Sequence, residues 1–218
     1  MVIYLDSGDP VAMREYGVRV AGFTTNPTLL KQGGGGWADL LAAANGKPVS
    51  FEVFADDFDE MERQARVIAS WRDNVYVKIP VTNTKGESTA PLMRKLGMEG
   101  IKINATAVMT MSQIETVARS LIYAPAILSI FCGRIADTGR DPVPFVTKAL
   151  AVKHAETQIL WASTREVYNV VQARQAGADI ITMTPDLIKK LDLTGKDLTE
   201  YSLDTVKMFY NDAKGLSL

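Results

Sequence analysis

A lysine stands in the middle of an apolar, β-branched run at positions 75–81, which reads Val-Tyr-Val-Lys-Ile-Pro-Val. Such a run is typical of a buried strand, in which Tyr76, Lys78 and Pro80 share one face. An enclosed ammonium group is costly unless it pairs with a carboxylate or loses its proton, and the unprotonated amine is a nucleophile. Lys78 is therefore a candidate Schiff-base lysine. A structural lysine in a buried ion pair is the alternative.

Other polar side chains fall near the ends of predicted strands, with the same alternation as Lys78. They are two carboxylates, an amide and two hydroxyls: Asp6, Glu52, Asn26, Thr106 and Ser129. Each has a structural alternative as well, since a carboxylate can cap a helix or pair with a lysine and an amide can serve a turn. We favour a shared site for the set, because polar groups in a dry core cost free energy unless they are used.

The elements that must position these residues alternate regularly along the chain. We expect strands at 2–6, 21–26, 48–54, 75–81, 102–107, 126–132, 158–162 and 179–183. We expect helices at 9–18, 37–44, 57–71, 89–96, 112–121, 143–154, 166–176 and 185–191. Eight strand-helix units favour the α/β class and a (β/α)8 TIM barrel, whose active sites lie at the carboxyl ends of the strands. An open doubly wound sheet is the alternative.

One further helix, at 198–214, lies outside the eight units. Its apolar face consists of Leu203, Val206, Phe209 and Tyr210. Such a face has to be covered, either by an end of the barrel or by a neighbouring subunit. We favour the neighbour, and we expect one barrel domain over 1–218 in which 198–218 is a C-terminal helix that packs on another subunit.

Two connections invite a functional interpretation. The glycine run at 33–36 lacks the preceding strand and the following Lys-Ser/Thr of a phosphate-binding loop, so we interpret it as a flexible linker. The connection after the sixth strand holds Arg134, Asp137 and the segment 139–142. Its length beside a strand end indicates a functional loop.

Composition narrows the classes of function. The 218 residues are 47% hydrophobic, enough for one large core, and 24 Lys and Arg balance 25 Asp and Glu. This balance argues against nucleic-acid and membrane-surface partners, and no apolar run is long enough to span a membrane. The single Cys132 excludes an intrachain disulfide, and the single His154 excludes a histidine-rich metal site. We expect a cytoplasmic protein without a metal.

Six segments are similar, in order and spacing, to the motifs of the transaldolase family. They are Leu5-Asp6, Thr24-Thr25-Asn26-Pro27-Thr28, Val77-Lys78-Ile79-Pro80, Asn104-Ala105-Thr106, Phe131-Cys132-Gly133-Arg134-Ile135 and Ala162-Ser163-Thr164-Arg165. The chain length resembles that of the small-subunit branch, which includes the fructose-6-phosphate aldolases. The resemblance implies a (β/α)8 barrel, a class I Schiff-base aldol mechanism on sugar phosphates and no metal or organic cofactor. It also implies a homo-oligomer, a pentamer or a decamer.

The resemblance also implies a role for each matching residue. Lys78 falls on the Schiff-base lysine, Asp6 on the acid/base aspartate, and Glu52 with Thr106 on the pair that holds a catalytic water. The substrate-binding positions are Thr25, Asn26, Ser129, Phe131, Arg134, Ser163 and Arg165, of which Arg134, Ser163 and Arg165 match the phosphate pocket.

The expected function is a class I transaldolase that moves a three-carbon dihydroxyacetone unit between sugar phosphates. The family's plain aldolases carry Gln at the Glu52 position and Tyr at the Phe131 position. At both positions this chain has the residue that the transaldolases carry. Aldolase-type release of free dihydroxyacetone and a non-catalytic sugar-phosphate-binding barrel are the alternatives. Ile130, Cys132 and Trp161 depart from residues common in the family, and these departures bear on the size of the pocket and so on which sugar it accepts.

Overall fold

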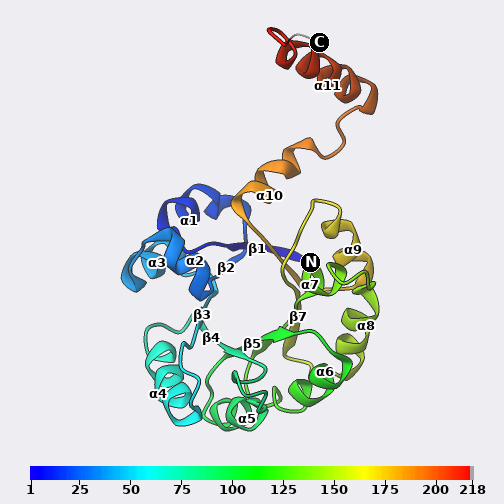
Figure 1. The fold of residues 1–218 in the computed structure, drawn as a ribbon. Helices are drawn as coiled ribbons and strands as arrows, with labels where there is room; N and C mark the ends of the chain where they lie inside the picture. The colour runs from blue at the N-terminus through cyan, green and yellow to red at the C-terminus, as the bar shows by residue number, and fades with distance from the viewer. Residues whose placement is uncertain (217–218) are drawn as a thin grey trace.

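The computed structural model describes residues 1–216, and its strands form one closed, parallel barrel in chain order (Figure 1). The strands are β1 (Val2–Asp6), β2 (Gly22–Thr24), β3 (Val49–Glu52), β4 (Val75–Pro80), β5 (Ile103–Val108), β6 (Ala126–Ile130), β7 (Thr157–Trp161) and β8 (Ile180–Met183). β8 pairs with β1 and closes the ring, so no strand edge stays unpaired. The expected (β/α)8 TIM barrel is confirmed.

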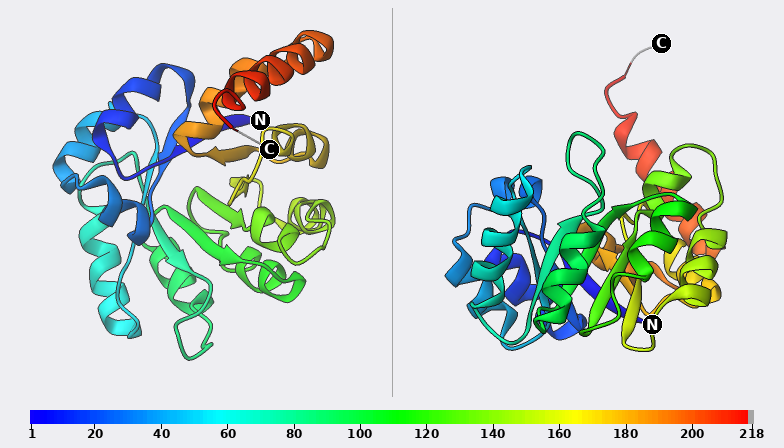
Figure 2. Two further views of the ribbon diagram at one scale, coloured as in Figure 1. Left: turned by 45° about the horizontal axis from the view of Figure 1, so that its top comes forward. Right: turned by 90° about the horizontal axis from the view of Figure 1, so that it is seen from below.

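The helices surround the barrel, except for the C-terminal helix, which extends away from it (Figure 2). They are α1 (Pro10–Tyr16), α2 (Pro27–Gly33), α3 (Trp37–Ala44), α4 (Phe58–Ala69), α5 (Ala90–Met98), α6 (Met111–Ala118), α7 (Cys132–Ala136), α8 (Val143–Val152), α9 (Asn169–Ala176), α10 (Pro185–Lys190) and α11 (Leu198–Asp212), with 3-10 turns η1 (Gly17–Arg19) and η2 (Leu191–Leu193). Side-chain N-caps begin five of them, from Asp9, Asn26, Asp57, Thr110 and Asp197. Within residues 1–216, none of these helices combines the length and the apolar character needed to cross a bilayer.

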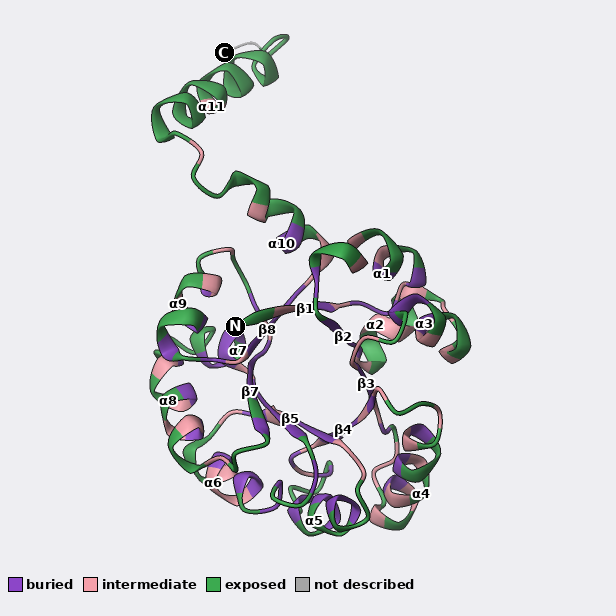
Figure 3. Ribbon diagram, turned by 180° about the vertical axis from the view of Figure 1, so that it is seen from behind, coloured by how far each residue is buried: buried purple, intermediate pink, exposed green. Residues whose placement is uncertain are grey.

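Strand alternation divides the apolar side chains into two layers. Residues such as Leu5, Phe51 and Val77 face outward and pack in the large core between the barrel and its helices. Tyr4, Ile127, Leu160, Ala162 and Ile180 face inward and form a separate cluster inside the barrel. Figure 3 shows that most strand residues are buried. The interior is therefore filled by side chains below the carboxyl ends of the strands.

The inward layer depends on a close approach between Gly22 and Tyr4. A Cβ atom at Gly22 would lie 2.6 Å from the Tyr4 ring, so the glycine makes room for the aromatic side chain inside the barrel. Tyr4 is buried in the inward cluster. Tyr4 therefore helps to fill the barrel interior below the polar residues at the strand ends.

The glycine run at 33–36 is more constrained than the linker interpretation suggests. A Cβ at Gly33 would lie 2.1 Å from the carbonyl oxygen of Gly8, and one at Gly35 would lie 2.5 Å from the Pro10 ring. Gly34 ends α2 in the left-handed conformation, with φ of 66°. The run therefore packs against the β1–α1 connection, and its glycines permit that close contact.

The C-terminal helix α11 projects away from the barrel (Figure 1). It contains no buried residue, and Phe209 is 62% exposed and Tyr210 70% exposed. Figure 3 colours almost all of the helix as exposed residues. Residues 217 and 218 of the predicted segment 198–218 lie outside the described residues. The apolar face predicted from the sequence is thus not covered by the helix's own barrel.

Candidate active site

A cavity of about 420 Å³ lies at the carboxyl ends of the strands. Nine of the eleven residues predicted from the sequence line it: Asp6, Asn26, Glu52, Lys78, Thr106, Ser129, Phe131, Arg134 and Ser163. Thr25 and Arg165 do not. Within residues 1–216, no group of three or more His, Cys, Asp or Glu side chains is placed to hold a metal ion.

Lys78 lines the cavity and contacts residues at the carboxyl ends of β2 and β3. Its Nζ lies 3.3 Å from Oε2 of Glu52 and donates a hydrogen bond of 2.8 Å to the backbone carbonyl of Thr25. The two side chains are 8% and 14% exposed, respectively. The β3–β4 register places Glu52 directly opposite Lys78, so the pairing of two neighbouring strands creates this contact.

The two carboxyl groups of the cavity are biased toward their protonated forms. Burial raises the pKa of Asp6, against the opposing effects of the Lys78 charge and a hydrogen bond from Thr24. Burial also raises the pKa of Glu52, again against the Lys78 charge. A carboxyl group whose pKa is raised holds a proton more readily than a free one, so it can act as a proton donor as well as an acceptor. The cavity therefore contains the Lys78 amine together with two carboxyl groups that can act as general acids or bases.

Thr24, rather than Thr25, faces the cavity. Its hydroxyl donates to Oδ1 of Asp6 at 2.8 Å, and the β1–β2 register sets the two residues opposite each other. The Thr25 hydroxyl donates instead to the backbone carbonyl of Ser50 at 2.9 Å. The strand alternation that was applied to Asn26 also points Thr24 inward, and this signal could have identified Thr24.

Thr106 presents a buried hydroxyl that no hydrogen-bonding group in the described residues satisfies. The strand is irregular just beyond it, because the β5–β6 register shifts between Ala105 and Val108 and Ala107 has φ of 60°. A buried hydroxyl without a protein partner is suited to a water or a substrate oxygen. This placement fits the water-holding role that the resemblance implies for Thr106 with Glu52.

Below the cavity, a polar chain crosses three strands. Ser129 donates to Oδ1 of Asn104 at 2.7 Å, and Nδ2 of Asn104 donates to the Ser50 hydroxyl at 3.0 Å. All three residues are buried. The chain fixes the amide orientation of Asn104 and leaves the oxygen of Ser129 at the cavity wall.

The far end of the cavity is formed where α7 meets the β7–α9 loop. The sequence pattern predicts no helix at 132–136, yet α7 carries Arg134 to the cavity wall. A Cβ at Gly133 would lie 1.6 Å from the Ser163 carbonyl oxygen, so the helix start and the loop are in direct backbone contact. Ser163 has φ of 63° and also lines the cavity. Only a glycine at position 133 permits this approach.

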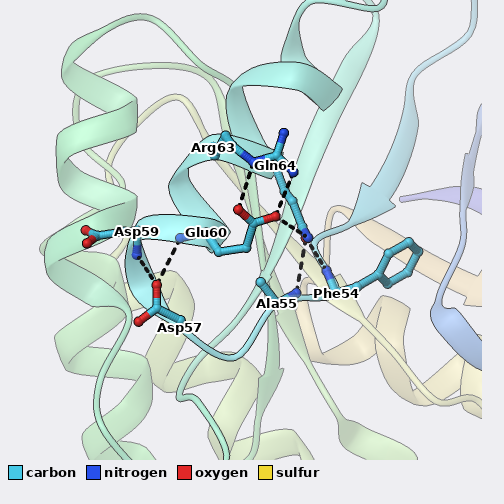
Figure 4. Close-up of polar contacts among 7 residues, drawn as sticks. All are labelled: Phe54, Ala55, Asp57, Asp59, Glu60, Arg63 and Gln64. Atoms are coloured by element: carbon cyan, nitrogen blue, oxygen red, sulfur yellow. Dashed lines mark hydrogen bonds and ion pairs between the residues drawn. The ribbon is translucent and has the colours of Figure 1, made fainter.

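The loop that follows Glu52 is held by the first turns of α4 (Figure 4). Oε1 of Gln64 accepts hydrogen bonds from the backbone N–H groups of Phe54 at 2.7 Å and Ala55 at 3.1 Å. Gln64 in turn donates to Glu60 at 3.2 Å, and Glu60 also binds Arg63. These contacts fix the chain two residues beyond the catalytic candidate Glu52.

The three departures from the family, Ile130, Cys132 and Trp161, lie away from the cavity. None of the three lines the cavity, and all three pack in the outer core between the barrel and its helices. Ile130 and Trp161 are register partners on β6 and β7, so the departures are neighbours in one outward layer. Burial raises the pKa of the Cys132 thiol, which suits a core residue rather than a nucleophile.

A family model described as Transaldolase/Fructose-6-phosphate aldolase matches residues 3–218. The chain belongs to this family. Among its relatives is a probable transaldolase of Maridesulfovibrio salexigens, 32% identical over 95% of this chain and 99% of the relative. A probable transaldolase of Methanococcus maripaludis is 32% identical over 88% of this chain and 89% of that protein. A probable transaldolase 2 of Listeria monocytogenes is 33% identical over 85% and 86%, respectively.

The solved structures extend the comparison to the fold alone. The tryptophan synthase A-subunit of Pyrococcus furiosus aligns with a TM-score of 0.57 over 91% of this chain and 92% of that chain. The identity is 12%, so this likeness supports the barrel and says nothing about the reaction. The transaldolase family assignment therefore rests on the sequence comparisons, and the residue roles rest on the site itself.

Proposed function

We propose that this protein is a class I transaldolase, which transfers a three-carbon dihydroxyacetone unit from a ketose phosphate to an aldose phosphate through a Schiff base on Lys78. One observation carries the proposal. The Lys78 amine is enclosed in a cavity 3.3 Å from the Glu52 carboxylate, with the second carboxyl group of Asp6 lining the same cavity. A purely structural ion pair would need only Lys78 and Glu52, and it would not explain a second carboxyl group in the same cavity.

The first half of the reaction forms the covalent intermediate. The Lys78 amine attacks the ketose carbonyl carbon and gives a carbinolamine. Proton transfers through a water bound by Glu52 and Thr106 allow the former carbonyl oxygen to leave as water, which produces an iminium ion. The raised pKa of Glu52 suits this role, because the carboxyl group must both give and accept a proton.

The second half breaks and remakes a carbon–carbon bond. Asp6 accepts the proton of the hydroxyl group on the carbon of the breaking bond that is farther from the iminium. That carbon becomes the aldehyde carbon, and the electron pair of the bond moves into the iminium. An aldose phosphate leaves, and a three-carbon enamine stays on Lys78. The enamine then attacks the aldehyde carbon of an acceptor aldose phosphate, Asp6 returns the proton, and hydrolysis releases the new ketose phosphate. Arg134 supplies a guanidinium group for the substrate phosphate.

Transfer is favoured over release of free dihydroxyacetone by the residues near the water. Phe131 lines the cavity and has no hydroxyl group that could help to protonate the enamine. Glu52 stands where the family's plain aldolases carry Gln. The enamine is therefore expected to persist until an acceptor arrives.

Oligomeric state and location complete the proposal. We infer a homo-oligomer, a pentamer or a decamer, in which α11 packs on a neighbouring barrel, because Val206, Phe209 and Tyr210 are exposed on a helix that projects from its own barrel. An apolar face of this kind is favourable only when another surface covers it. A cytoplasmic location agrees with the chain's single, free cysteine.

Borohydride trapping tests the proposal. The protein would be incubated with fructose 6-phosphate, reduced with borohydride and mapped by peptide mass spectrometry. A covalent three- or six-carbon adduct on Lys78 is expected. Its absence would rule out the Schiff-base mechanism and leave the non-catalytic sugar-phosphate-binding barrel.

A further inference from the structure

The guanidinium group of Arg165 binds the carboxylate of Asp137, and both residues lie within three positions of a residue that lines the cavity. Its Nε lies 3.2 Å from Oδ1 of Asp137, and its Nη2 lies 2.5 Å from Oδ2. This two-point geometry is the one that arginine uses to bind a phosphate group. Arg165 does not line the cavity, whereas Arg134 does. Asp137 therefore satisfies the donors that a phosphate would otherwise use.

The carboxylate is placed to influence both arginines. Asp137 ends α7 three residues after Arg134, so the two side chains leave neighbouring points of one helix. The side-chain hydrogen bond from Arg165, and then the charges of Arg165 and Arg134, lower the pKa of Asp137, so the group is an anion at neutral pH. The two partners are about half exposed, with Arg165 at 49% and Asp137 at 50%. Their pair is therefore open to exchange with an incoming anion.

Hydrogen bonds fix the backbone of the segment that carries Arg165. Oδ1 of Asn169 accepts hydrogen bonds from the backbone N–H groups of Arg165 at 2.9 Å and Glu166 at 3.1 Å. Gly133 holds the start of α7 against Ser163. With both chain segments anchored, the arginine side chain is the part that can move between the carboxylate and the cavity.

We propose that Asp137 is a specificity-determining residue, a latch that holds Arg165 outside the cavity and that the phosphate group of a substrate must displace. The inference rests on the proposed function, because it assumes that the phosphate group of a sugar phosphate binds where Arg134 lines the cavity. In the resting enzyme, Arg134 alone presents a guanidinium group to the cavity. A phosphorylated substrate recruits Arg165 by exchange, and an unphosphorylated substrate leaves the latch closed.

The Asp137→Asn variant tests the latch through substrate affinity. It removes the anion and keeps the shape, so the KM for fructose 6-phosphate should fall about two- to fivefold, the range of a partly exposed ion pair. The inhibition constant of inorganic phosphate against fructose 6-phosphate should fall by a similar factor. The kcat, and the rate of borohydride trapping with dihydroxyacetone, should stay within about twofold of the wild-type values.

A double-mutant cycle attributes the effect to Arg165. Combined with Arg165→Ala, the Asp137→Asn change should no longer alter the KM, because the group that it releases is absent. Glu166→Gln is the matched control, since it removes an exposed carboxylate next to Arg165 in the chain and should leave the KM unchanged. A circular-dichroism melt of each variant shows that it is folded.

The outcomes separate the latch from the proposed function. A higher KM in Asp137→Asn would mean that the carboxylate orients Arg165 toward phosphate, and an unchanged KM would mean that the ion pair is only structural. Either result overturns the latch. If dihydroxyacetone still labels Lys78 in those cases, the transaldolase proposal stands without it. Failure of the wild-type protein to label at all would instead remove the proposed function.

Discussion

Lys78 Nζ and Glu52 Oε2 lie 3.3 Å apart at the carboxyl ends of two neighbouring strands. The pair is enclosed, so both charges have lost much of their hydration. Burial raises the pKa of Glu52 and lowers the cost of moving a proton onto its carboxyl group. A single proton transfer therefore changes an ion pair into a neutral amine and a neutral acid, which is the state that attacks a carbonyl carbon.

Lys78→Arg should remove turnover while it preserves folding. The guanidinium group keeps the positive charge opposite Glu52 but cannot lose its proton, so the nucleophile is absent. We expect the rate of transfer to fall by at least about 10²-fold, as removal of a nucleophile does. A coupled assay with fructose 6-phosphate and erythrose 4-phosphate measures it.

Lys102→Arg is the control, because Lys102 donates to the Asp73 carbonyl at 2.6 Å and does not line the cavity. It should retain wild-type activity and the borohydride adduct. Activity in Lys78→Arg above about a tenth of the wild-type value would contradict a Schiff base on Lys78.

Thr24→Val should move the acid limb of the pH profile of kcat/KM to higher pH. The Thr24 hydroxyl donates to the Asp6 carboxylate at 2.8 Å and so favours its charged form. Without that hydrogen bond the pKa of Asp6 rises further, and cleavage requires the carboxylate. We expect an upward shift of about one pH unit, since a hydrogen bond to a charged group contributes about 1.5 kcal/mol and 1.36 kcal/mol corresponds to one unit.

Thr25→Val is the matched control for the pH profile. Its hydroxyl binds the Ser50 carbonyl and does not reach Asp6, so the acid limb should stay in place. If the acid limb of the kcat/KM profile does not move in Thr24→Val, or moves equally in both variants, the ionisation of Asp6 does not determine that limb.

Strand alternation predicted most of the site, because it depends only on the two-residue period of a strand. Lys78, Glu52 and Thr106 were assigned to one mouth in this way, and all three line the cavity. The same alternation turns Ile130 and Trp161 outward, so the expected effect of these residues on the pocket did not follow from their positions.

The contacts of α7 and of Arg165 were not predictable from the periodicity of the sequence. Helix α7 has five residues, too few to show a helical pattern in the sequence. The Arg165–Asp137 pair joins two connections that are 28 residues apart. Such a contact depends on how neighbouring strands are arranged in the barrel, so it becomes visible only in three dimensions.

Arg134→Ala should weaken the binding of phosphorylated substrates. A guanidinium group contacts the phosphate in the ground state and the transition state alike, so the KM rises and kcat changes little. Charge-assisted hydrogen bonds of about 1.5–3 kcal/mol predict a KM that is about 10- to 100-fold higher. Steady-state kinetics with fructose 6-phosphate measures it, and the trapping rate with dihydroxyacetone should change less.

Arg140→Ala is the control for Arg134. Arg140 lies in the same connection, but it donates to the Thr138 hydroxyl at 2.9 Å and does not line the cavity. Its removal should leave the KM unchanged. Equal losses with phosphorylated and unphosphorylated donors in Arg134→Ala would make Arg134 a structural residue.

Deletion of residues 198–218 should dissociate the oligomer. The exposed apolar face of α11 would lose its surface on the neighbour, so the mass in solution should fall. Size-exclusion chromatography with light scattering measures the mass. Phe209→Ser should weaken assembly, whereas Lys207→Ser, on the same exposed helix, should not. A monomeric wild-type protein would end this proposal.

The last prediction separates transfer from simple aldol cleavage. Phe131 lines the cavity and brings no hydroxyl group to it, so the enamine on Lys78 lacks one source of a proton. Wild-type protein should therefore consume fructose 6-phosphate quickly only when an acceptor such as erythrose 4-phosphate is present. The double variant Phe131→Tyr with Glu52→Gln should release more free dihydroxyacetone without an acceptor, because a tyrosine hydroxyl can bind the catalytic water and help to protonate the enamine.

Each change on its own shows which residue carries the effect. Phe131→Tyr adds the proton donor while Glu52 keeps its contact with Lys78, and Glu52→Gln removes the charge from that contact without adding a donor. We expect most of the shift toward release to follow the tyrosine. Dihydroxyacetone can be measured by its enzymatic reduction, and the transfer product by chromatography. If wild-type protein releases dihydroxyacetone without an acceptor as fast as it transfers the unit to one, the protein is an aldolase and the transaldolase proposal is wrong.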